Sequence, residues 1–371
     1  MASLRPVHRS WVEVSGGALL ANVRALREHL GGAVGVMAVV KANAYGHGAP
    51  EVVRALRGSV EWFGVACVRE AMEIAPQAGG TPILVLGPAL PQERHSLLQE
   101  GFVPVISDWE EAQAYAALAG PRGVEVHLAI DSGMGRIGVW ETEAVELLRA
   151  CAGLRGLRVS GVASHLPAAD EDDTYTLQQL TRFRSLVEEL RAMRLFEGVV
   201  HVENSAGAIG FPSDAWDLVR AGLMLYGCAP RPEFQGRLRG GMTWKTRITL
   251  LRNVGKGRTI SYGRTYVVEE PARIATLAVG YADGFQRHLS NRGAEVLVGG
   301  VRCPVLGRVT MDQIMVDVSA AGDVRTGDEV VLMGRQGGEE IGVAELAAKA
   351  GTIPWEIFTG IGRRVAREVV S

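Results

Sequence analysis

Two kinds of segment alternate through the first 230 residues, and this alternation limits the fold more than any other feature. Eight short apolar runs, rich in β-branched residues, are typical of strands buried on both faces. Between them lie amphipathic stretches such as "GALLANVRALREHL" (17–30), where apolar residues recur at helical spacing. The runs are "VGVMAVV" (34–40), "WFGVAC" (62–67), "PILVLG" (82–87), "FVPVI" (102–106), "VEVHLAI" (124–130), "LRVSGVASH" (157–165), "VVHVEN" (199–204) and "AWDLVRAGL" (215–223). Strands that alternate with helices predict a parallel sheet, and eight of them favour a closed (β/α)8 barrel of TIM type over an open sheet.

The pattern changes after about residue 235, where short strands broken by glycine turns replace the helices. "RGGMTWKTRITLLRNV" and "GDEVVLMG" are typical of this part, and little helix is expected before "GVAELAAKAG". We therefore expect an α/β protein with a barrel over residues 1–235 and a smaller, mostly β domain over 236–371. The early strand "WVEV" (11–14) precedes the first barrel helix and is a candidate to pair with the β domain.

Charge and hydropathy argue against several classes of partner. The chain has 39 basic and 41 acidic residues and no basic run, so neither nucleic acid nor an anionic membrane surface is expected as a partner. No stretch approaches the roughly 20 apolar residues of a membrane span, and the first residues lack the apolar core of a signal peptide. The four cysteines lie far apart without zinc-site spacing, which indicates a cytoplasmic protein with reduced thiols.

Active sites of barrels lie at the carboxyl ends of the strands, so polar residues at those ends are the candidates. They are Lys41, Arg136, His165, Asn204, Ser205, Arg220 and Gly222. Ser205 and Gly222 follow the seventh and eighth runs, where such barrels bind a phosphate group. The eight histidines are scattered, so we expect no metal site. Each candidate could instead be a polar group that only satisfies a strand end, and position alone leaves both interpretations open.

Lys41 ends an apolar run and is followed by a sharp turn through two glycines, in "KANAYGHG" (41–48). A lysine in a barrel mouth beside a phosphate site suggests an amine that forms an imine. Amines attack carbonyls only when neutral, and burial near other cations lowers the pKa of a lysine enough for that. The cofactor that combines an aldehyde with a phosphate is pyridoxal 5′-phosphate, whose ring stabilises carbanions.

The segment "AVVKANAYGHG" (38–48) resembles the cofactor-lysine signature of the alanine racemase family. Further motifs follow in that family's order and spacing over nearly the whole chain. They are "IDSGMGRIG" (130–138), "SHLPAADE" (164–171), "ENSAG" (203–207), "VRAGLMLYG" (219–227), "SYGRTY" (261–266), "VGYADG" (279–284) and "GRVTMDQ" (307–313). The resemblance implies an N-terminal barrel and a C-terminal β domain, in agreement with the fold expected above.

The resemblance also implies a mechanism with two bases. Lys41 would hold the cofactor as an internal aldimine and then act as one acid–base group, while Tyr262 of the partner subunit would act on the opposite face of the substrate. His165 and Arg220 would form the proton relay that lowers the tyrosine's pKa from its usual value near 10. Arg220 would also face the pyridine nitrogen, and because arginine does not readily protonate the ring, transamination should be limited.

The remaining site residues are assigned by the same resemblance. Tyr45, Ser205, Gly222 and Leu223 would bind the phosphate, with Asn204 in the same cofactor site. Arg136 and the backbone near Met311, with Asp312 close by, would orient the cofactor oxygen and the substrate carboxylate. Tyr281 would line the entrance.

At two positions the chain departs from the family pattern. Many members have a lysine, often carbamylated, where this chain has Ala129. Because a buried guanidinium without a counter-charge is costly, we expect a small anion such as chloride, or a different carboxylate, beside a buried Arg136. Trp355 stands where the family usually has a phosphate-binding tyrosine, in "PYE". The indole keeps an aromatic wall and hence a small pocket, but its N–H can only donate, so the phosphate contact should change.

We therefore expect a pyridoxal-phosphate-dependent amino-acid racemase that interconverts L- and D-alanine. It would act as a homodimer with shared active sites and supply D-alanine for a bacterial cell wall. Racemisation of another amino acid, such as serine, is the nearest alternative. A related decarboxylase would need a carboxylate at the pyridine nitrogen, where this chain offers Arg220. A non-catalytic pyridoxal-phosphate carrier would share the barrel and Lys41 but would have no use for Tyr262.

Overall fold

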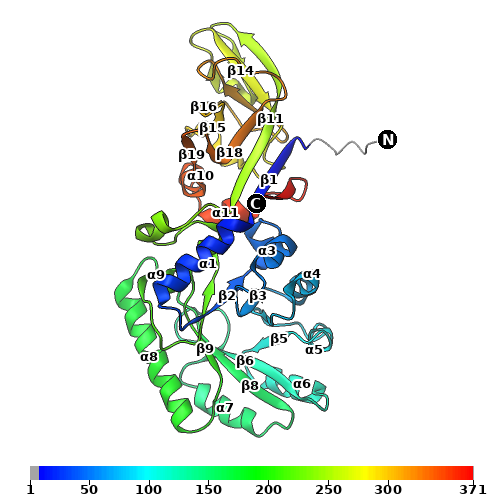
Figure 1. The fold of residues 1–371 in the computed structure, drawn as a ribbon, viewed down its shortest axis with the longest axis vertical. Coiled ribbons are helices and arrows are strands. Elements are labelled where there is room, and N and C mark those ends of the chain that lie inside the picture. The colour runs from blue at the N-terminus through cyan, green and yellow to red at the C-terminus, as the bar shows by residue number, and fades with distance from the viewer. Residues whose placement is uncertain (1–7, 371) are drawn as a thin grey trace. The chain divides into compact units, whose positions relative to one another are not determined.

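The computed structural model describes residues 8–370 and divides into two compact units (Figure 1). The barrel unit consists of Ala18–Ala44 and Ala49–Arg239. The β unit takes the chain up to Gly17, the short segment Tyr45–Gly48 and the residues from Gly240 onward. The chain thus leaves the barrel unit briefly, directly after the segment that carries Lys41.

Among the described residues, eight strands form the barrel sheet in the order β10-β2-β3-β4-β5-β6-β8-β9, and the paired neighbours are parallel. They are β2 (Gly35–Val39), β3 (Trp62–Val65), β4 (Ile83–Val85), β5 (Val103–Ile106), β6 (Val124–Asp131), β8 (Leu157–Ala163), β9 (Val199–His201) and β10 (Leu218–Ala221). The ring closes between β9 and β10, where the Asp217 N–H donates to Val200 O and the Arg220 N–H to Glu203 O, both at 2.9 Å. The predicted barrel is confirmed; a short additional strand, β7 (Val139–Trp140), pairs with β6.

Helices connect successive strands and present their apolar faces to the sheet, as the helical spacing predicts. The main ones are α1 (Gly16–Leu30), α3 (Ala49–Leu56), α4 (Val68–Ala78), α5 (Arg94–Gln99), α6 (Trp109–Leu118), α7 (Ala144–Ala152), α8 (Asp173–Ala192) and α9 (Ser205–Gly210). On α8, Leu180, Phe183, Val187 and Leu190 are buried at spacings of three and four. None of the helices within residues 8–370 has the length and apolar character needed to cross a bilayer.

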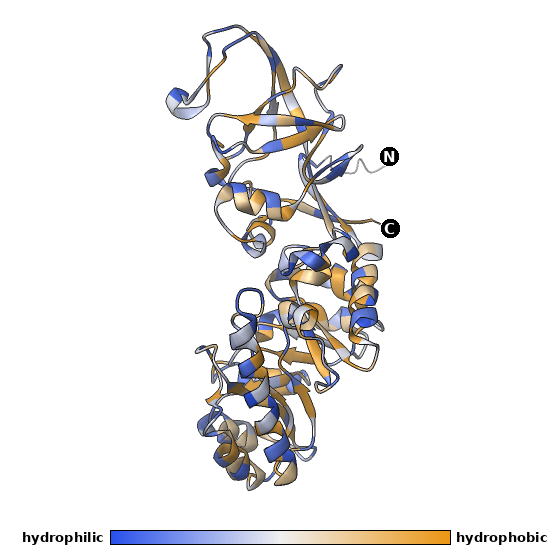
Figure 2. Ribbon diagram, turned by 90° about the vertical axis from the view of Figure 1, so that its left-hand side faces the viewer, coloured by the Kyte–Doolittle hydropathy of each residue, from blue (hydrophilic) through white to orange (hydrophobic). Residues whose placement is uncertain are grey.

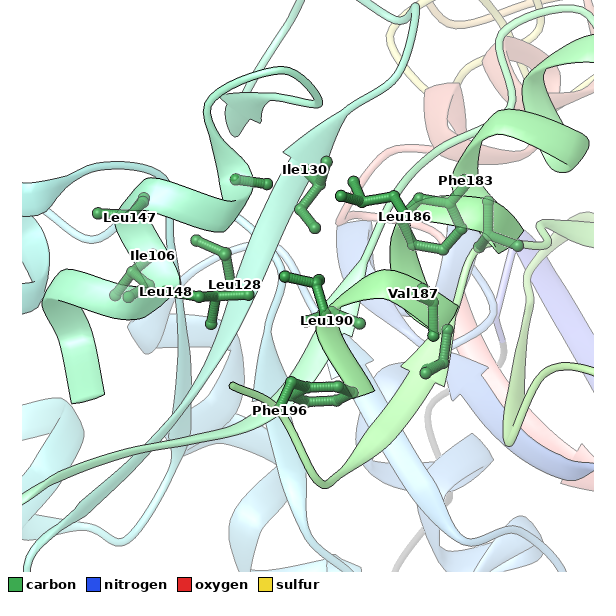
Figure 3. Packing of buried hydrophobic residues seen from close by; sticks show 14 of the residues in the cluster. Ile106, Leu128, Ile130, Leu147, Leu148, Phe183, Leu186, Val187, Leu190 and Phe196 are labelled. Carbon is green, nitrogen blue, oxygen red and sulfur yellow. The ribbon is translucent and has the colours of Figure 1, made fainter. Parts of the chain in front are cut away.

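The best-defined apolar layer lies between one side of the barrel sheet and the helices that cover it. Leu128 and Ile130 of β6 face Leu186 and Leu190 of α8, with Phe196 at the end of the layer (Figure 3). Apolar colouring likewise follows the barrel strands and the helix faces turned toward them (Figure 2). Burial of this layer supplies the hydrophobic stabilisation that fixes the strand ends.

The β unit is built on a sheet with the order β19-β18-β15-β16-β17-β14-β11-β1-β20. The strands are β1 (Ser10–Ser15), β11 (Met242–Val254), β14 (Ala272–Leu277), β15 (Glu295–Val298), β16 (Val301–Leu306), β17 (Ile314–Asp317), β18 (Glu329–Gln336), β19 (Glu339–Ile341) and β20 (Ala366–Val370). Strand β1 pairs antiparallel with β11, placing Trp11 opposite Lys245. Two helices, α10 (Val343–Ala350) and α11 (Pro354–Gly360), complete the unit.

Candidate active site

The carboxyl ends of the barrel strands carry the predicted polar residues. Lys41 comes just after β2, His165 just after β8, and Ser205 just after β9, while Arg220 lies within β10. In a parallel barrel these ends share one rim, so these residues lie at the same end of the barrel. Arg136 lies in the loop beyond β6.

Lys41 is followed by an unusual left-handed turn. Ala42, Asn43, Ala44 and Tyr45 have φ values of 52°, 56°, 52° and 51°, and none of them is glycine. Such a conformation costs about 1–2 kcal/mol per residue, so it persists only when neighbouring groups hold it. Within this segment the Ala44 N–H donates to Val40 O at 2.8 Å, and Asn43 Oδ1 accepts the Ala49 N–H at 2.8 Å.

The electrostatic surroundings favour a neutral Lys41 amine. Burial is the largest cause that lowers the pKa of Lys41, and the positive charges of Arg136 and Arg220 lower it further. Glu70, on α4, acts in the opposite direction and raises it. Glu70 was not identified from the sequence, because its closeness to Lys41 depends on how α4 folds back over two strand ends.

Arg220 is the centre of a buried hydrogen-bond network. Its side chain donates to His165 Nδ1 at 3.0 Å and to His201 Nδ1 at 2.9 Å. It also donates to the backbone oxygens of Ser164, His201 and Val202 at 2.7–3.1 Å. Burial lowers the pKa of Arg220 to about 10, so the guanidinium remains charged at neutral pH. With this many acceptors, its orientation is fixed.

The arginine also sets the tautomers of the neighbouring histidines. Since Arg220 can only donate, the Nδ1 atoms of His165 and His201 must accept, which leaves the proton on Nε2 of each neutral ring. His201 Nε2 lies 2.9 Å from Nδ1 of His127, so the chain of bonds continues into the barrel. Burial, together with Arg220, holds the pKa of His165 down to about 3 and that of His201 well below its usual value. His127 and His201 lay inside predicted strands and were not singled out, since a polar residue in an apolar run gives no signal of its partner.

Ser205 and Gly222, predicted as a phosphate site, are brought together. Ser205 Oγ accepts the Gly222 N–H at 2.9 Å, and Leu223 begins the short helical turn that follows. Asn204 caps α9 through its Oδ1, which accepts the Gly207 N–H, and its Nδ2 donates to Leu166 O. Asn204 therefore has a structural task in addition to its predicted place in the cofactor site.

The segment Tyr45–Gly48 packs on the helix that carries Trp355. A Cβ on Gly46 would lie 2.2 Å from the backbone oxygen of Phe358, so only glycine fits there. The His47 ring contacts the Phe358 ring edge-on, with centroids 4.9 Å apart. Tyr45 is buried, and burial raises the pKa of its phenol to about 12. Trp355 itself is half-buried in α11.

The predicted residues of the β unit gather around the loop that contains Met311. Tyr281 N–H donates to Thr310 O, and Ala282 N–H to Met311 O, both at 3.0 Å. Such close backbone contact needs Gly280, because a Cβ there would lie 2.3 Å from the Met311 oxygen. The loop is also held at its other end, where Ser261, next to Tyr262, donates to Arg308 O. Tyr262, Tyr281 and Met311 are exposed by 71%, 41% and 53%.

An ion-pair network locks the same loop. Arg364 donates from Nε and Nη2 to the two carboxylate oxygens of the buried Asp283, and Nη2 also donates to Asp312 Oδ1. Asp283 in turn accepts the Gly280 N–H at 2.8 Å. Arg364 was missed in the sequence because it follows α11, far along the chain from both aspartates.

Arg136 differs from the expectation in one respect. The argument for an anion beside it assumed a buried guanidinium, but Arg136 is exposed in the described chain, although Ala129 is buried. Desolvation within one subunit therefore does not demand a counter-ion. Within residues 8–370, no cluster of three or more His, Cys, Asp or Glu side chains could hold a metal ion.

The fold and the site together define a barrel enzyme with an appended β domain and a cationic centre at the strand ends. Comparison with known proteins identifies the family. Residues 14–230 match the alanine racemase N-terminal domain, and residues 241–369 match the alanine racemase C-terminal domain. The chain belongs to the alanine racemase family, as its motifs predicted, and is an amino-acid racemase, an isomerase.

Relatives and solved structures resemble the chain over nearly its whole length. An alanine racemase from Symbiobacterium thermophilum is 45% identical over 364 residues, with 96% of each chain covered. One from Halothermothrix orenii is 42% identical, covering 97% of this chain and 96% of its own. The structure of alanine racemase from Clostridium difficile has a TM-score of 0.91 at 32% identity, covering 99% of this chain and 98% of that one.

Proposed function

We propose that this protein interconverts L- and D-alanine with pyridoxal 5′-phosphate as its cofactor. Family membership supports the reaction, and structures of relatives carry matching ligands: cycloserine in the Clostridium difficile enzyme and L-Ala-P in that from Bacillus anthracis. The observation that carries the proposal is Lys41, an amine of lowered pKa at a strand end beside the fixed Arg220.

The side chains present fit this cofactor. Lys41 supplies a neutral amine for its aldehyde. Ser205 accepts from the Gly222 N–H, which leaves its hydroxyl proton available to a phosphate oxygen. Leu223, Asn204, Tyr45 and Trp355 would complete the cofactor site, as the family motifs suggest. When bound, the cofactor supplies an electron-withdrawing ring that stabilises negative charge at the substrate's α-carbon.

The chain's own residues would remove and return the proton at the substrate's α-carbon. Lys41 Nζ and the Tyr262 hydroxyl would be the two acid–base groups, one for each enantiomer. Arg220 stays charged and holds His165 neutral, with the proton on Nε2. A neutral His165 can pass a hydrogen bond on to the tyrosine without adding a second cation there. Because Arg220 donates rather than accepts, it would bind the pyridine nitrogen without protonating it.

The proposal includes a homodimer in which each site draws on both subunits. Tyr262 is largely exposed, and so are Met311 and Tyr281 around it. An acid–base tyrosine needs neighbours that adjust its pKa, and covering this surface with a second copy of the chain would provide them. The barrel group of one copy and the β group of the other would then form one site.

Substrate recognition is assigned to Arg136, Met311, Asp312 and Tyr281. The Met311 oxygen accepts the Ala282 N–H, which fixes the peptide whose backbone we assign to the substrate carboxylate. The positive charge of Arg136 disfavours the charged forms of both Lys41 and Arg220, so this centre should attract anions. We also propose a chloride ion beside Arg136, where it would take over the role that a carbamylated lysine at the position of Ala129 has in many family members. Activity that does not respond to halide, with no anion density beside Arg136, would reject it.

Within this proposal the protein works in the cytoplasm. Its four cysteines are free thiols, and three of them are buried. Reduced thiols are typical of that compartment, where D-alanine would be made for the cell wall.

Two measurements test the proposed function. Incubation with L-alanine and pyridoxal phosphate should reduce optical rotation to zero, because the enantiomers have equal free energies. Borohydride reduction and peptide mapping should place a pyridoxyl label on Lys41. A label on Lys245, Lys256 or Lys349 instead would contradict the assignment of Lys41.

A further inference from the structure

Glu70 joins two strand ends through a single carboxylate. Its Oε1 accepts the Ala42 N–H at 2.8 Å, and its Oε2 accepts the Ala66 N–H at 2.8 Å. Ala42 is the residue after Lys41, and Ala66 follows β3. A side chain on α4 therefore fastens the end of β2 to the end of β3.

The first of these bonds falls where the left-handed turn begins. Ala42 has the first positive φ after Lys41, and the turn has no glycine that would adopt this conformation without strain. Described side chains contact the backbone at both ends of this turn: Glu70 accepts the Ala42 N–H, and His47 Nδ1 lies 3.0 Å from Tyr45 O. From within the turn, Asn43 Oδ1 accepts the Ala49 N–H. Losing Glu70 would release the end of the turn nearest the lysine.

We propose that Glu70 is a positioning residue for Lys41, which holds the turn that presents the amine and supplies a negative charge that acts on it. This inference rests on the proposed function and deepens it by adding a residue that touches neither substrate nor cofactor. Among residues 8–370, the charged groups that act on Lys41 are Arg136, Arg220 and Glu70, and of these three Glu70 alone favours the protonated amine. The negative charge of Glu70 thus opposes the effect of the two arginines on the Lys41 amine. The amine can therefore carry a proton as well as release one, as an acid–base group must.

Two substitutions separate the charge from the geometry. Glu70→Gln keeps the length of the side chain but has one acceptor oxygen, so it loses one N–H bond and the charge. Glu70→Asp keeps the charge but is one methylene shorter, so it should not span both strand ends. Glu73→Gln is the matched control, since it removes the same charge from an exposed position of the same helix.

The test measures the proton affinity of Lys41 in the full-length chain freed of cofactor. Competitive acetylation with acetic anhydride across pH, read by peptide mass, gives the pKa of each lysine amine, with Lys245, Lys256 and Lys349 as internal references. Glu70→Gln should lower the pKa of Lys41, so that its acetylation at a fixed pH below that pKa rises about 3- to 10-fold. Glu70→Asp should change this rate less but slow the uptake of pyridoxal phosphate, measured as pyridoxyl label on Lys41 after borohydride.

Identical Lys41 profiles in Glu70→Gln, Glu73→Gln and the parent protein would overturn the inference. If Glu70→Gln does not fold, Glu70→Asp decides: uptake equal to that of the parent protein would overturn it. Failure of the proposed function looks different, because the parent protein itself would then take no pyridoxyl label on Lys41. The acetylation profile is measured without cofactor and is independent of that outcome.

Discussion

Arg364 and Asp312 form an ion pair with a nitrogen-to-oxygen distance of 2.6 Å. The same guanidinium also donates to both carboxylate oxygens of Asp283. The pair ties the loop of Met311 to that of Tyr281, the two loops assigned to substrate binding. A pair this exposed adds little to stability, so its importance should show in binding geometry.

Replacing Arg364 should impair binding, and it should also lower stability, because it leaves the buried Asp283 carboxylate without its cation. Arg364→Ala should raise the KM for alanine, with a loss of up to about 100-fold in kcat/KM, because small displacements of positioning groups cost that much. Arg325→Ala removes an exposed pair with Asp323 in the same unit, without leaving a buried carboxylate behind, and should have little effect. Equal kinetics for both variants would show that the network is only structural.

Mixing two inactive variants should restore activity if the sites are shared. Lys41→Ala removes the proposed acid–base group of the barrel, and Tyr262→Ala removes the one proposed for the β unit. A mixed dimer would contain one intact site, so steady-state assays after subunit exchange should recover part of the parent rate. The absence of recovery, when exchange is proven by mass spectrometry, would count against a shared site.

The two bases should act on different enantiomers. Tyr262→Ala should lose α-hydrogen exchange in deuterated solvent for one enantiomer by about 10²–10⁴-fold, the usual contribution of a general base. Exchange from the other enantiomer should be much less affected, since Lys41 remains. Equal losses from L- and D-alanine would contradict this division.

Trp355 should keep the substrate pocket small. Alanine should be preferred over serine, and lysine and arginine should be poor substrates, because an apolar wall discriminates by about 1–3 kcal/mol per methylene. Trp355→Tyr should change the affinity for pyridoxal phosphate, since a phenol can accept as well as donate. Comparison of kcat/KM for the four amino acids tests the first expectation, and cofactor titration tests the second.

Glu203 should make stability depend on pH. It is fully buried, and burial raises the pKa of its carboxyl to about 8, an effect that Trp216 and Arg220 only partly offset. The folded protein therefore holds a proton that the unfolded chain releases near pH 4.5. The contribution of Glu203 to the free energy of unfolding should be full below pH 4.5. It should fall by about 1.4 kcal/mol per pH unit as pH rises toward 8, a few kcal/mol in total.

Glu203→Gln removes this titration without changing the shape of the side chain. Its gain in Tm over the parent protein should be small at pH 5 and should grow toward pH 8. Thermal unfolding at several pH values measures it, and a gain that does not vary with pH would rule out the buried neutral carboxyl.

The sequence was sufficient for the barrel and for the residues at its strand ends. Alternating runs fix the order of the strands, and strand order brings Lys41, His165, Ser205 and Arg220 to one rim whatever the details of packing. The residues that hold the site residues in place, and the solvent exposure of each side chain, could not be predicted in this way. Arg136, for example, was expected to be buried and is exposed.

The groups that were missed act across the fold rather than along the chain. Glu70 bonds to Ala42, Arg364 bonds to Asp312, and His127 bonds to His201, each over a long sequence separation. No local pattern marks such pairs. The left-handed turn was hidden for another reason, since alanine and tyrosine rarely adopt it and are held there by tertiary bonds.

That turn also has a consequence for when the protein becomes chemically competent. A left-handed run of Ala42, Asn43, Ala44 and Tyr45 has no local tendency to form, so it must wait until its anchors exist. One of them is Glu70, whose helix has to dock across the end of β3 before it can meet Ala42. A chain in which α4 has not docked therefore lacks the Glu70 bond to Ala42 and should not display Lys41 as the finished barrel does.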